Sequence, residues 1–509
     1  MTLVLLLAIV GTAAWVVLRA WGSPGLELLF LIPAVLCLFT IGYVVFPVGA
    51  HILGVGGTGQ FVGIDPADVA MATAVHAAFF GLFLAGYFSR GMNARRSLGS
   101  LVLVNSFSRL PRGARTTILG LVVLCGMFPI LFLPQGYAVN FQSAVDSPAE
   151  SALQNVLLFP GRFYFAVLAV GLAVFLARRR VLFFSLSAVL FFGSVVLGAS
   201  GGTRAALFHP VMVLVGALYC LGEKRRALGV MLAGIAVLVG TSALLVSFRG
   251  SELRSSTDSV KRLEDLMDKH SGGFGVTDNI DSLLDRADVV SNTAVMIRYL
   301  DVGRRYAGFE PYMGVLAAPV PRVFWPDKPV AGSDDGTMHG HVSLVLARIR
   351  YGYEYTAVTA HGPVEMYWQF GWWGVVVGAF VGGYICRRIS EACMHGGLVG
   401  IVTLLSLAEA LVFGVGPSLD WLLMCVMQVF VPVWLVTTFW ARVWPGRVLV
   451  RGGGCWQRRR NTSIASRRRD RCSLGGLVRG SSLPTMTGYC AEQGQGRGAA
   501  RPSDYMVGL

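Results

Sequence analysis

The feature that most constrains this chain is a series of apolar stretches, each long enough to cross a bilayer as a helix. A bilayer's hydrocarbon core is about 30 Å thick, and an α-helix needs about 20 apolar residues to span it. Only 14% of the 509 residues are charged, against about 25% in a soluble domain. The sequence therefore predicts an all-α, polytopic integral membrane protein. Its eleven expected helices occupy residues 2–20, 25–46, 67–87, 117–134, 163–177, 181–199, 206–221, 227–247, 371–386, 397–415 and 421–441.

Basic residues in the short connections predict how these helices are oriented. The connection 88–116 holds six arginines and no acidic residue, whereas 135–162 holds one arginine and two acidic residues. Cytoplasmic loops are enriched in Lys and Arg, so we expect 88–116 in the cytoplasm. By alternation, Lys224–Arg226 and Arg387–Arg388 lie there too. The predicted location is the cell (inner or plasma) membrane, with the N-terminus extracytoplasmic and the C-terminus cytoplasmic.

The net charge of +15 comes mainly from a tail at the C-terminus. Residues 442–509 contain 13 arginines and three acidic residues. The tail is rich in Ser and Gly and has little apolar periodicity, so we expect it to be disordered near the anionic inner leaflet. The sequence thus divides into a transmembrane domain, 1–441, and this Arg-rich cytoplasmic tail. Because the basic residues otherwise sit in loops, nucleic-acid binding is not expected.

One connection, residues 248–370 between expected helices eight and nine, is far longer than the others. It contains 16 of the 28 acidic residues and no cysteine, so neither a disulfide nor a thiolate metal site can form within it. Long loops with their own helices are usually functional. We expect this loop to be extracytoplasmic. Within it, apolar residues recur at helical spacing and predict an amphipathic helix against the membrane domain or at its surface: Leu283, Ala287, Val290, Ala294 and Ile297.

The most informative segment of this loop is 319–329, PVPRVFWPDKP. Its prolines fix φ at several positions and exclude a regular helix, so the segment is expected to hold Arg322 and Lys328 in place at the membrane surface. Arginine offers a planar fork that fits phosphate oxygens, and lysine a mobile point charge. The alternative is an interfacial hinge whose cations pair with Asp327 or lipid headgroups.

The loop ends in HGPVEMYWQFGWWG, residues 361–374. If this stretch is helical, His361 and Glu365 lie one turn apart on one face, and either group could act as a general base for a sugar hydroxyl. The alternative is that Glu365 caps a helix or pairs with an arginine. Gly371 and Gly374 are expected to allow close helix packing.

Further arginines are candidates for substrate binding. Arg204 lies in the short turn SGGTRAA on the expected outer side, where a basic residue opposes the orientation rule. Arg298 and Arg305 follow the amphipathic helix and could extend a basic site, or they could form a solvated face.

Other polar residues allow competing interpretations. A divalent metal could bind where ligand-type side chains cluster in DDGTMHGH, although such groups in flexible loops are more often solvated: Asp334, Asp335, His339 and His341. Glu409 lies inside an expected membrane helix, where an ionisable group is commonly functional. His76 is interpreted as a hydrogen-bonded histidine of the helix bundle.

At PRVFWPDKP followed by GPVEMYWQFGWWG, the chain resembles the Wzy-type polysaccharide repeat-unit polymerases, the O-antigen polymerase class. In that class a proline-rich element closes a large outer loop, and a Glu-x-Tyr-x-x-x-Gly-x-x-Gly-like stretch enters the next membrane helix. The matching residues of that stretch here are Glu365, Tyr367, Phe370, Gly371 and Gly374. An arginine after a small-residue turn, as at Arg204, is also similar.

The resemblance implies a membrane-embedded glycosyltransferase that needs neither a metal nor another cofactor. Its donor and acceptor would be oligosaccharides on polyprenyl pyrophosphate carriers. Its other partners would be membrane lipid and a chain-length regulator or a flippase. Arg204, Arg322 and Lys328 would stabilise the leaving pyrophosphate, with Glu365 or His361 as the base. Two alternatives stay open: a transporter or flippase for lipid-linked glycans, and a metal-dependent lipid-linked glycosyltransferase.

Overall fold

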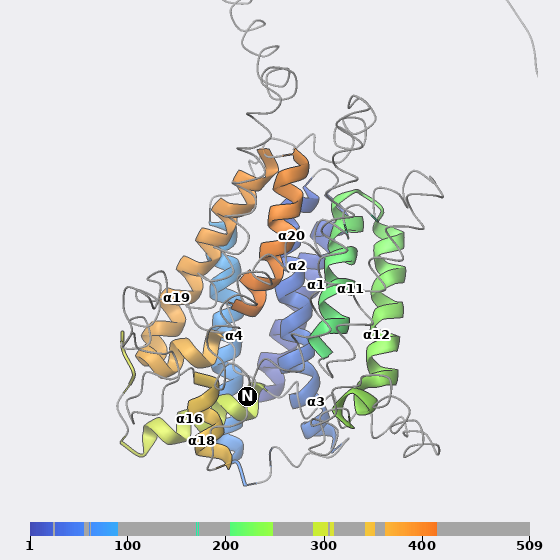
Figure 1. Ribbon diagram of the computed structural model, residues 1–509. Coiled ribbons are helices and arrows are strands. Elements are labelled where there is room, and N and C mark those ends of the chain that lie inside the picture. The colour runs from blue at the N-terminus through green and yellow to red at the C-terminus, as the bar shows by residue number, and fades with distance from the viewer. Residues whose placement is uncertain are drawn as a thin grey trace, which may run out of the picture. The chain divides into compact units, whose positions relative to one another are not determined.

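Figure 1 shows the computed structural model of the chain, in which every described secondary-structure element is helical. The structure describes residues 1–23, 26–54, 61, 63–89, 169, 172, 204–247, 289–303, 306–309, 342–351, 362–395 and 397–414. The helices are α1 (Thr2–Trp21), α2 (Glu27–Thr40), the π-helical η1 (Ile41–Val45), α3 (Phe46–Leu53), α4 (Pro66–Phe88), α11 (Arg204–Cys220), α12 (Lys224–Ser247), α16 (Val289–Asp301), α18 (Val342–Tyr351), α19 (Gly362–His395) and α20 (Gly397–Gly414). The chain divides into two units, Met1–Thr438 and Phe439–Leu509, and every described residue belongs to the first.

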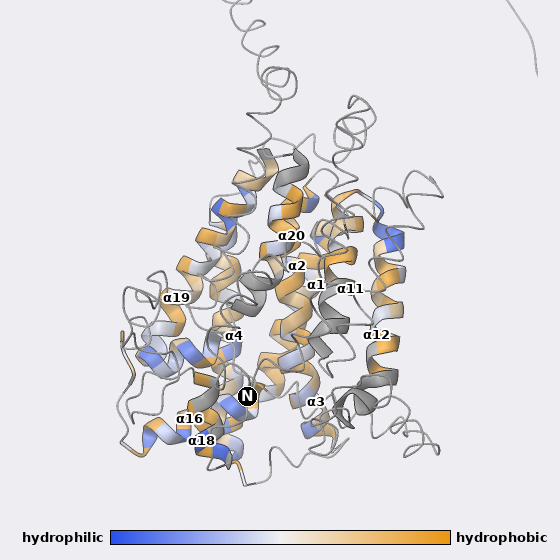
Figure 2. Ribbon diagram, in the orientation of Figure 1, coloured by the Kyte–Doolittle hydropathy of each residue, from blue (hydrophilic) through white to orange (hydrophobic). Residues whose placement is uncertain are grey.

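Within this part of the chain, four helical stretches are long and apolar enough to cross a membrane. They are Thr2–Trp21, Glu27–Leu53, Pro66–Phe88 and Gly362–Met394. Figure 2 shows apolar residues along most of α1, α2, α4 and α20, whereas hydrophilic residues gather around α16 and α18. For the residues that the structure describes, the prediction of an all-α chain is confirmed, and four helices have the length and apolar composition that the predicted membrane spans require.

Several expected helices appear with nearly the expected bounds. Besides α1 and α4, helices form at three expected positions, as α11, α12 and α20. The expected helices 117–134, 181–199 and 421–441 lie outside the described residues, as does all of 163–177 except residues 169 and 172. The Arg-rich tail also lies outside them.

The helix α19 is longer than the expected span 371–386 at both ends, and this corrects the placement of Arg387. Arg387 was expected in a short cytoplasmic loop, but it belongs to α19 and its side chain is buried. Its guanidinium Nε lies 2.8 Å from a carboxylate oxygen of Glu391, and its Cζ lies 5.6 Å from the centre of the Tyr87 ring. Because this ion pair and the ring stabilise the charge, the helix continues past the arginine.

The helices α4 and α19 cross at unusually close range because glycines line the crossing. A Cβ atom added at Gly86 of α4 would overlap the carbonyl of Phe380, and one added at Gly383 of α19 would overlap the carbonyl of Phe83. Small residues let helix backbones approach closely in membrane proteins. This crossing fixes the position of α19 relative to α4.

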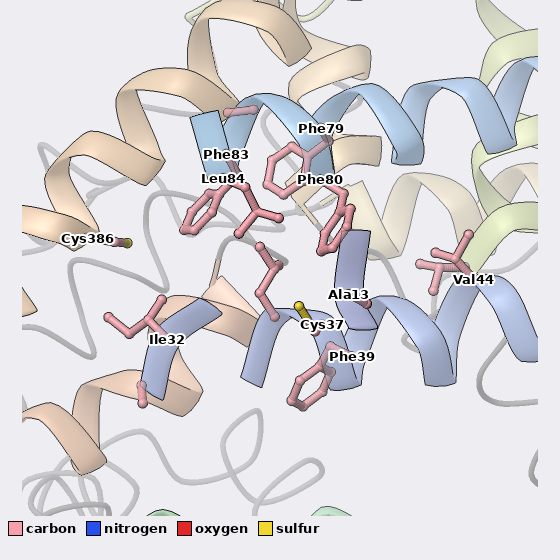
Figure 3. Close-up of a cluster of buried hydrophobic side chains, with 14 of the residues drawn as sticks. Ala13, Ile32, Cys37, Phe39, Val44, Phe79, Phe80, Phe83, Leu84 and Cys386 are labelled. Carbon is pink, nitrogen blue, oxygen red and sulfur yellow. The ribbon is translucent and has the colours of Figure 1, made fainter. Parts of the chain in front are cut away.

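Large apolar side chains fill the space between α4 and the N-terminal helices (Figure 3). Residues 28–33 of α2 are buried around the whole circumference of the helix, as expected for a central helix. The labelled side chains of this core are Ala13, Ile32, Cys37, Phe39, Val44, Phe79, Phe80, Phe83, Leu84 and Cys386. The four described cysteines (Cys37, Cys220, Cys386 and Cys393) are buried and unbridged, so they act as small packed apolar residues of the core.

Polar contacts join α1, α2, α4 and α12 at one end of the helices. Lys224 Nζ, at the start of α12, donates a hydrogen bond to the carbonyl of Trp21 at 2.7 Å and lies 3.8 Å from a carboxylate oxygen of Glu27. The Tyr87 hydroxyl donates to the carbonyl of Leu29 at 2.6 Å. The turns after α1 and α11 therefore lie beside the end of α4. The helices α16 and α18 lie at the opposite end, with the N-terminus (Figure 1).

Candidate functional site

The helix α19 is broken at Gly371, close to the predicted catalytic residue Glu365. Gly371 has φ 60° and ψ −144°, a conformation that costs residues other than glycine about 1–3 kcal/mol. It divides α19 into a first part, 362–370, and a second part, 372–395. Atoms of the Tyr306 ring lie 3.1 Å from the place that a Cβ on Gly371 would take, so the ring packs against the break.

The expected role of Gly374 in close packing is confirmed, but its partner is unexpected. A Cβ on Gly374 would overlap the carbonyl oxygen of Met366, and one on Gly378 would lie 2.6 Å from the Met366 sulfur. Both glycines therefore pack the second part of α19 against its own first part. The first part thus folds back tightly at the break, and this fold sets the direction in which it runs.

Residues 306–309, which we name the capping segment, supply backbone donors at the break. The Ala307 N–H donates to the carbonyl of Trp368 at 3.1 Å, and the Gly308 N–H donates to the carbonyl of Gln369 at 2.9 Å. In a continuous helix these carbonyls would accept from residues beyond Gly371. Phe309 adds an edge-to-face contact with Phe370, with ring centres 4.8 Å apart. The capping segment therefore holds the first part of α19 at its C-terminal end.

The carboxylate of Glu365 is buried in this first part of α19. Its side chain is 5% exposed, and its Oε1 accepts a hydrogen bond from Nε2 of Gln369 at 3.0 Å. Gln369 is 1% exposed. The amide thus orients a carboxylate that is shielded from bulk water, an arrangement suited to accepting a proton from a hydroxyl group. The neighbouring Trp368 Nε1–H is also buried and finds no acceptor among the described residues.

The helix α16 carries several buried polar side chains and packs against α19, the helix that contains Glu365. It contacts α4, α18 and α19, and Ser291, Asn292 and Thr293 are all buried in it. His76 of α4 lies 2.8 Å from Thr293, measured from Nε2 to Oγ1. Because the Thr293 hydroxyl donates to the carbonyl of Val289, His76 Nε2 is the donor in this contact. The interpretation of His76 as a hydrogen-bonded bundle residue is therefore confirmed.

A basic residue of α18 completes the polar cluster. Nη1 of Arg350 donates to Oδ1 of Asn292 at 2.6 Å and to Oγ of Ser291 at 3.2 Å. Hydrogen bonds from a charged donor are roughly twice as strong as neutral ones. Arg350 therefore fastens α18 to α16, which itself packs on α4 and α19. We use the name polar cluster for two hydrogen-bonded groups that lie on contacting helices: His76, Ser291, Asn292, Thr293 and Arg350 form one group, and Glu365 and Gln369 form the other.

The amphipathic helix predicted in the long loop is present, but it is more deeply buried than expected. Val290, Ala294 and Ile297 lie in α16 and are buried as predicted, whereas Leu283 and Ala287 lie outside the described residues. The polar residues between the apolar ones are buried as well. The N-terminal half of α16 is thus enclosed by neighbouring helices and does not lie on a surface.

The other predicted site residues have different outcomes. Arg298 is exposed at the end of α16, where its Nη1 donates to the carbonyl of Gly63 at 3.4 Å, and no described contact joins it to the polar cluster. Arg204 is the first residue of α11, and Glu409 lies in α20; the structure describes the side chain of neither. The remaining predicted residues lie outside the described ones: Arg305, Arg322, Lys328, Asp334, Asp335, His339, His341 and His361.

Sequence reasoning missed five residues of the cluster: Ser291, Asn292, Thr293, Arg350 and Gln369. Gln369 stands alone as a polar residue in an apolar aromatic stretch, and Arg350 lies within the short helix α18. A lone amide in an apolar helix must find a hydrogen-bond partner, and Glu365 lies one turn before it. That spacing was the available signal for Gln369. For Arg350 the sequence holds no comparable signal, because its partners lie in another helix.

Comparisons with protein-family models, curated proteins and solved structures find no match for this chain. Among the residues that the structure describes, no group of three or more His, Cys, Asp or Glu side chains could hold a metal ion. The chemistry available in the described part of the cluster is that of one oriented carboxylate, one histidine and several hydrogen-bond donors.

Proposed function

We propose that this protein is an oligosaccharide repeat-unit polymerase of the cell membrane. It would transfer a growing glycan from its polyprenyl pyrophosphate carrier to a lipid-linked repeat unit. The proposal combines the resemblance to Wzy-type polymerases with one structural observation. Glu365, the acidic residue of the resembling motif, is buried and oriented by Gln369 next to helices that belong to the long loop.

The proposed reaction forms one bond, breaks another and transfers one proton, and each of these steps needs a residue of the site. The acceptor hydroxyl oxygen forms a bond to the anomeric carbon of the donor, and the bond from that carbon to the pyrophosphate oxygen breaks. The electron pair leaves with the pyrophosphate, and the hydroxyl proton passes to the carboxylate of Glu365. Arg322, Lys328 and Arg204 would stabilise the departing negative charge. The energy comes from the pyrophosphate linkage, so the reaction requires no nucleotide.

The proposal also assigns sides of the membrane. The long loop, α16 and the N-terminus would lie outside the cytoplasm, where lipid-linked glycans are extended, and the Arg-rich tail inside. The end of the helices that carries Lys224 and Glu27 would then face the cytoplasm. Partners would be the lipid-linked donor and acceptor, with a flippase or a chain-length regulator nearby.

Bond formation by the purified protein tests this function. Lipid-linked repeat units would be extracted from a strain that lacks the gene, where they should accumulate, and supplied to the full-length protein in lipid vesicles. We expect products that differ in mass by whole repeat units, also in the presence of a chelator. Transport of the unit without a new glycosidic bond would contradict the proposal and indicate a transporter.

The lysine variants of two arginines test the proposed pyrophosphate contacts. Arg322→Lys and Arg204→Lys keep the charge but lose the two-pronged geometry of the guanidinium. Loss of one preorganised contact of this kind costs about 100- to 1,000-fold in rate. Each variant should therefore insert normally while the strain accumulates single lipid-linked units, detected by mass. Near-normal amounts of long glycan with Arg322→Lys would remove Arg322 from the site, since a headgroup anchor tolerates lysine.

A further inference from the structure

We propose that Gln369 is the positioning residue of Glu365, and that the capping segment holds Gln369 in place. This inference rests on the proposed function, in which Glu365 accepts the proton. Gln369 joins two parts of the structure that lie far apart in the sequence. Its side chain donates to the Glu365 carboxylate, and its backbone carbonyl accepts from Gly308 of the capping segment.

The side-chain contact restricts the carboxylate. Glu365 and Gln369 are one helical turn apart, so their side chains lie on the same face of the first part of α19. Both are almost completely buried, and the hydrogen bond between Nε2 and Oε1 is 3.0 Å long. A donor amide at this distance restricts the rotamer of the carboxylate. Such support decides whether a catalytic group stands within reach of its substrate.

The backbone contacts restrict the glutamine. The break at Gly371 removes the next helical turn, which would otherwise hold the carbonyls of Trp368 and Gln369. Ala307 and Gly308 donate to these two carbonyls, and Gly308 has φ 59°, which glycine adopts without strain. The capping segment follows α16 in the chain. The position of Glu365 is therefore tied to the fold of the long loop and not to the membrane helix alone.

In the sequence, the capping segment also adjoins the part of the long loop that holds candidate cationic residues. The capping segment directly follows Arg305 and precedes the proline-rich element that contains Arg322. Through its hydrogen bonds, the capping segment fixes the start of this stretch against the part of α19 that carries Glu365.

A double-mutant cycle tests the positioning role. Gln369→Met keeps the length of the side chain but removes the donor. We expect the rate of polymerisation, measured with lipid-linked units from the deletion strain and normalised to folded protein, to fall by up to about 100-fold. If Gln369 acts only through Glu365, adding Gln369→Met to Glu365→Gln should change the residual rate less than twofold. Non-additivity of this kind distinguishes coupled residues from independent ones.

Ser390→Ala serves as the matched control because it removes a different buried hydrogen bond of α19, the one that the Ser390 hydroxyl donates to the carbonyl of Cys386 at 3.0 Å. If Ser390→Ala lowers the rate of polymerisation, it should lower it by the same factor in the unmodified protein and in the Glu365→Gln variant. If Gln369→Met does not fold, Gln369→Asn replaces it, since it withdraws the amide by one methylene. Two results would overturn the inference and leave the proposed function intact. One is that Gln369→Met lowers the rate by the same factor with Glu365 as with Glu365→Gln, as is expected for Ser390→Ala. The other is that Gln369→Met leaves the rate unchanged. Absence of polymerisation by the unmodified protein would instead overturn the proposed function, and this inference with it.

Discussion

Replacing Glu365 with Gln is expected to lower the rate of polymerisation by about 100- to 10,000-fold, the usual contribution of a positioned general base. The variant keeps the size of the side chain, and its amide oxygen can still accept from Gln369, so the buried contact at 3.0 Å survives. It cannot accept the proton of the acceptor hydroxyl. The measurement is the rate of glycan extension in vesicles, together with the amount of single lipid-linked unit in cells.

Glu223→Gln provides the control for this prediction. It removes the same charge at the other end of the helices, where Glu223 pairs with Arg226 at 3.4 Å and its side chain is 36% exposed. Exposed pairs of this kind contribute about 0–1 kcal/mol, so the variant should polymerise at the unmodified rate. Full activity of Glu365→Gln would show that another group, with His361 as the next candidate, takes the proton.

Replacing Gly86 with Ala is expected to destabilise the protein by about 1–3 kcal/mol or more, the range for overpacking a close contact. The added Cβ would overlap the carbonyl of Phe380, and neither backbone can move away without opening the crossing of α4 and α19. The effect is measured as a lower midpoint of thermal unfolding in detergent and a smaller amount of folded protein in the membrane. Gly383→Ala, on the opposite side of the crossing, should act in the same direction.

Gly81→Ala is the matched control within the same helix. No atom lies within 4 Å of a Cβ added at Gly81, and alanine is the better helix former. This variant should therefore unfold at the same temperature as the unmodified protein or slightly above it. Equal stability of Gly86→Ala and Gly81→Ala would mean that the two helices do not cross as closely as the structure has them.

Much of the architecture follows from local sequence. The apolar stretches predicted α1 and α4 closely, because helix length and hydropathy are properties of neighbouring residues. Helical spacing also predicted the buried positions Val290, Ala294 and Ile297 of α16. The motif around Glu365 identified the candidate carboxylate, since a lone acidic residue beside an apolar helix is conspicuous in the sequence.

Contacts between distant segments account for what local patterns left undecided. His76 and Thr293 are separated by 217 positions and yet share a hydrogen bond. The capping segment likewise donates hydrogen bonds to carbonyls of α19, which lies far from it in the sequence. Arg387, counted from the sequence as a loop cation, is buried because Tyr87 and Glu391 surround it. The helical periodicity of apolar residues predicts which face of a helix is buried, but it does not predict which other helix covers that face. The hydrogen bond between Glu365 and Gln369 follows from their spacing of one helical turn, whereas the burial of Glu365 depends on which segments pack against the first part of α19, and only the tertiary structure decides that.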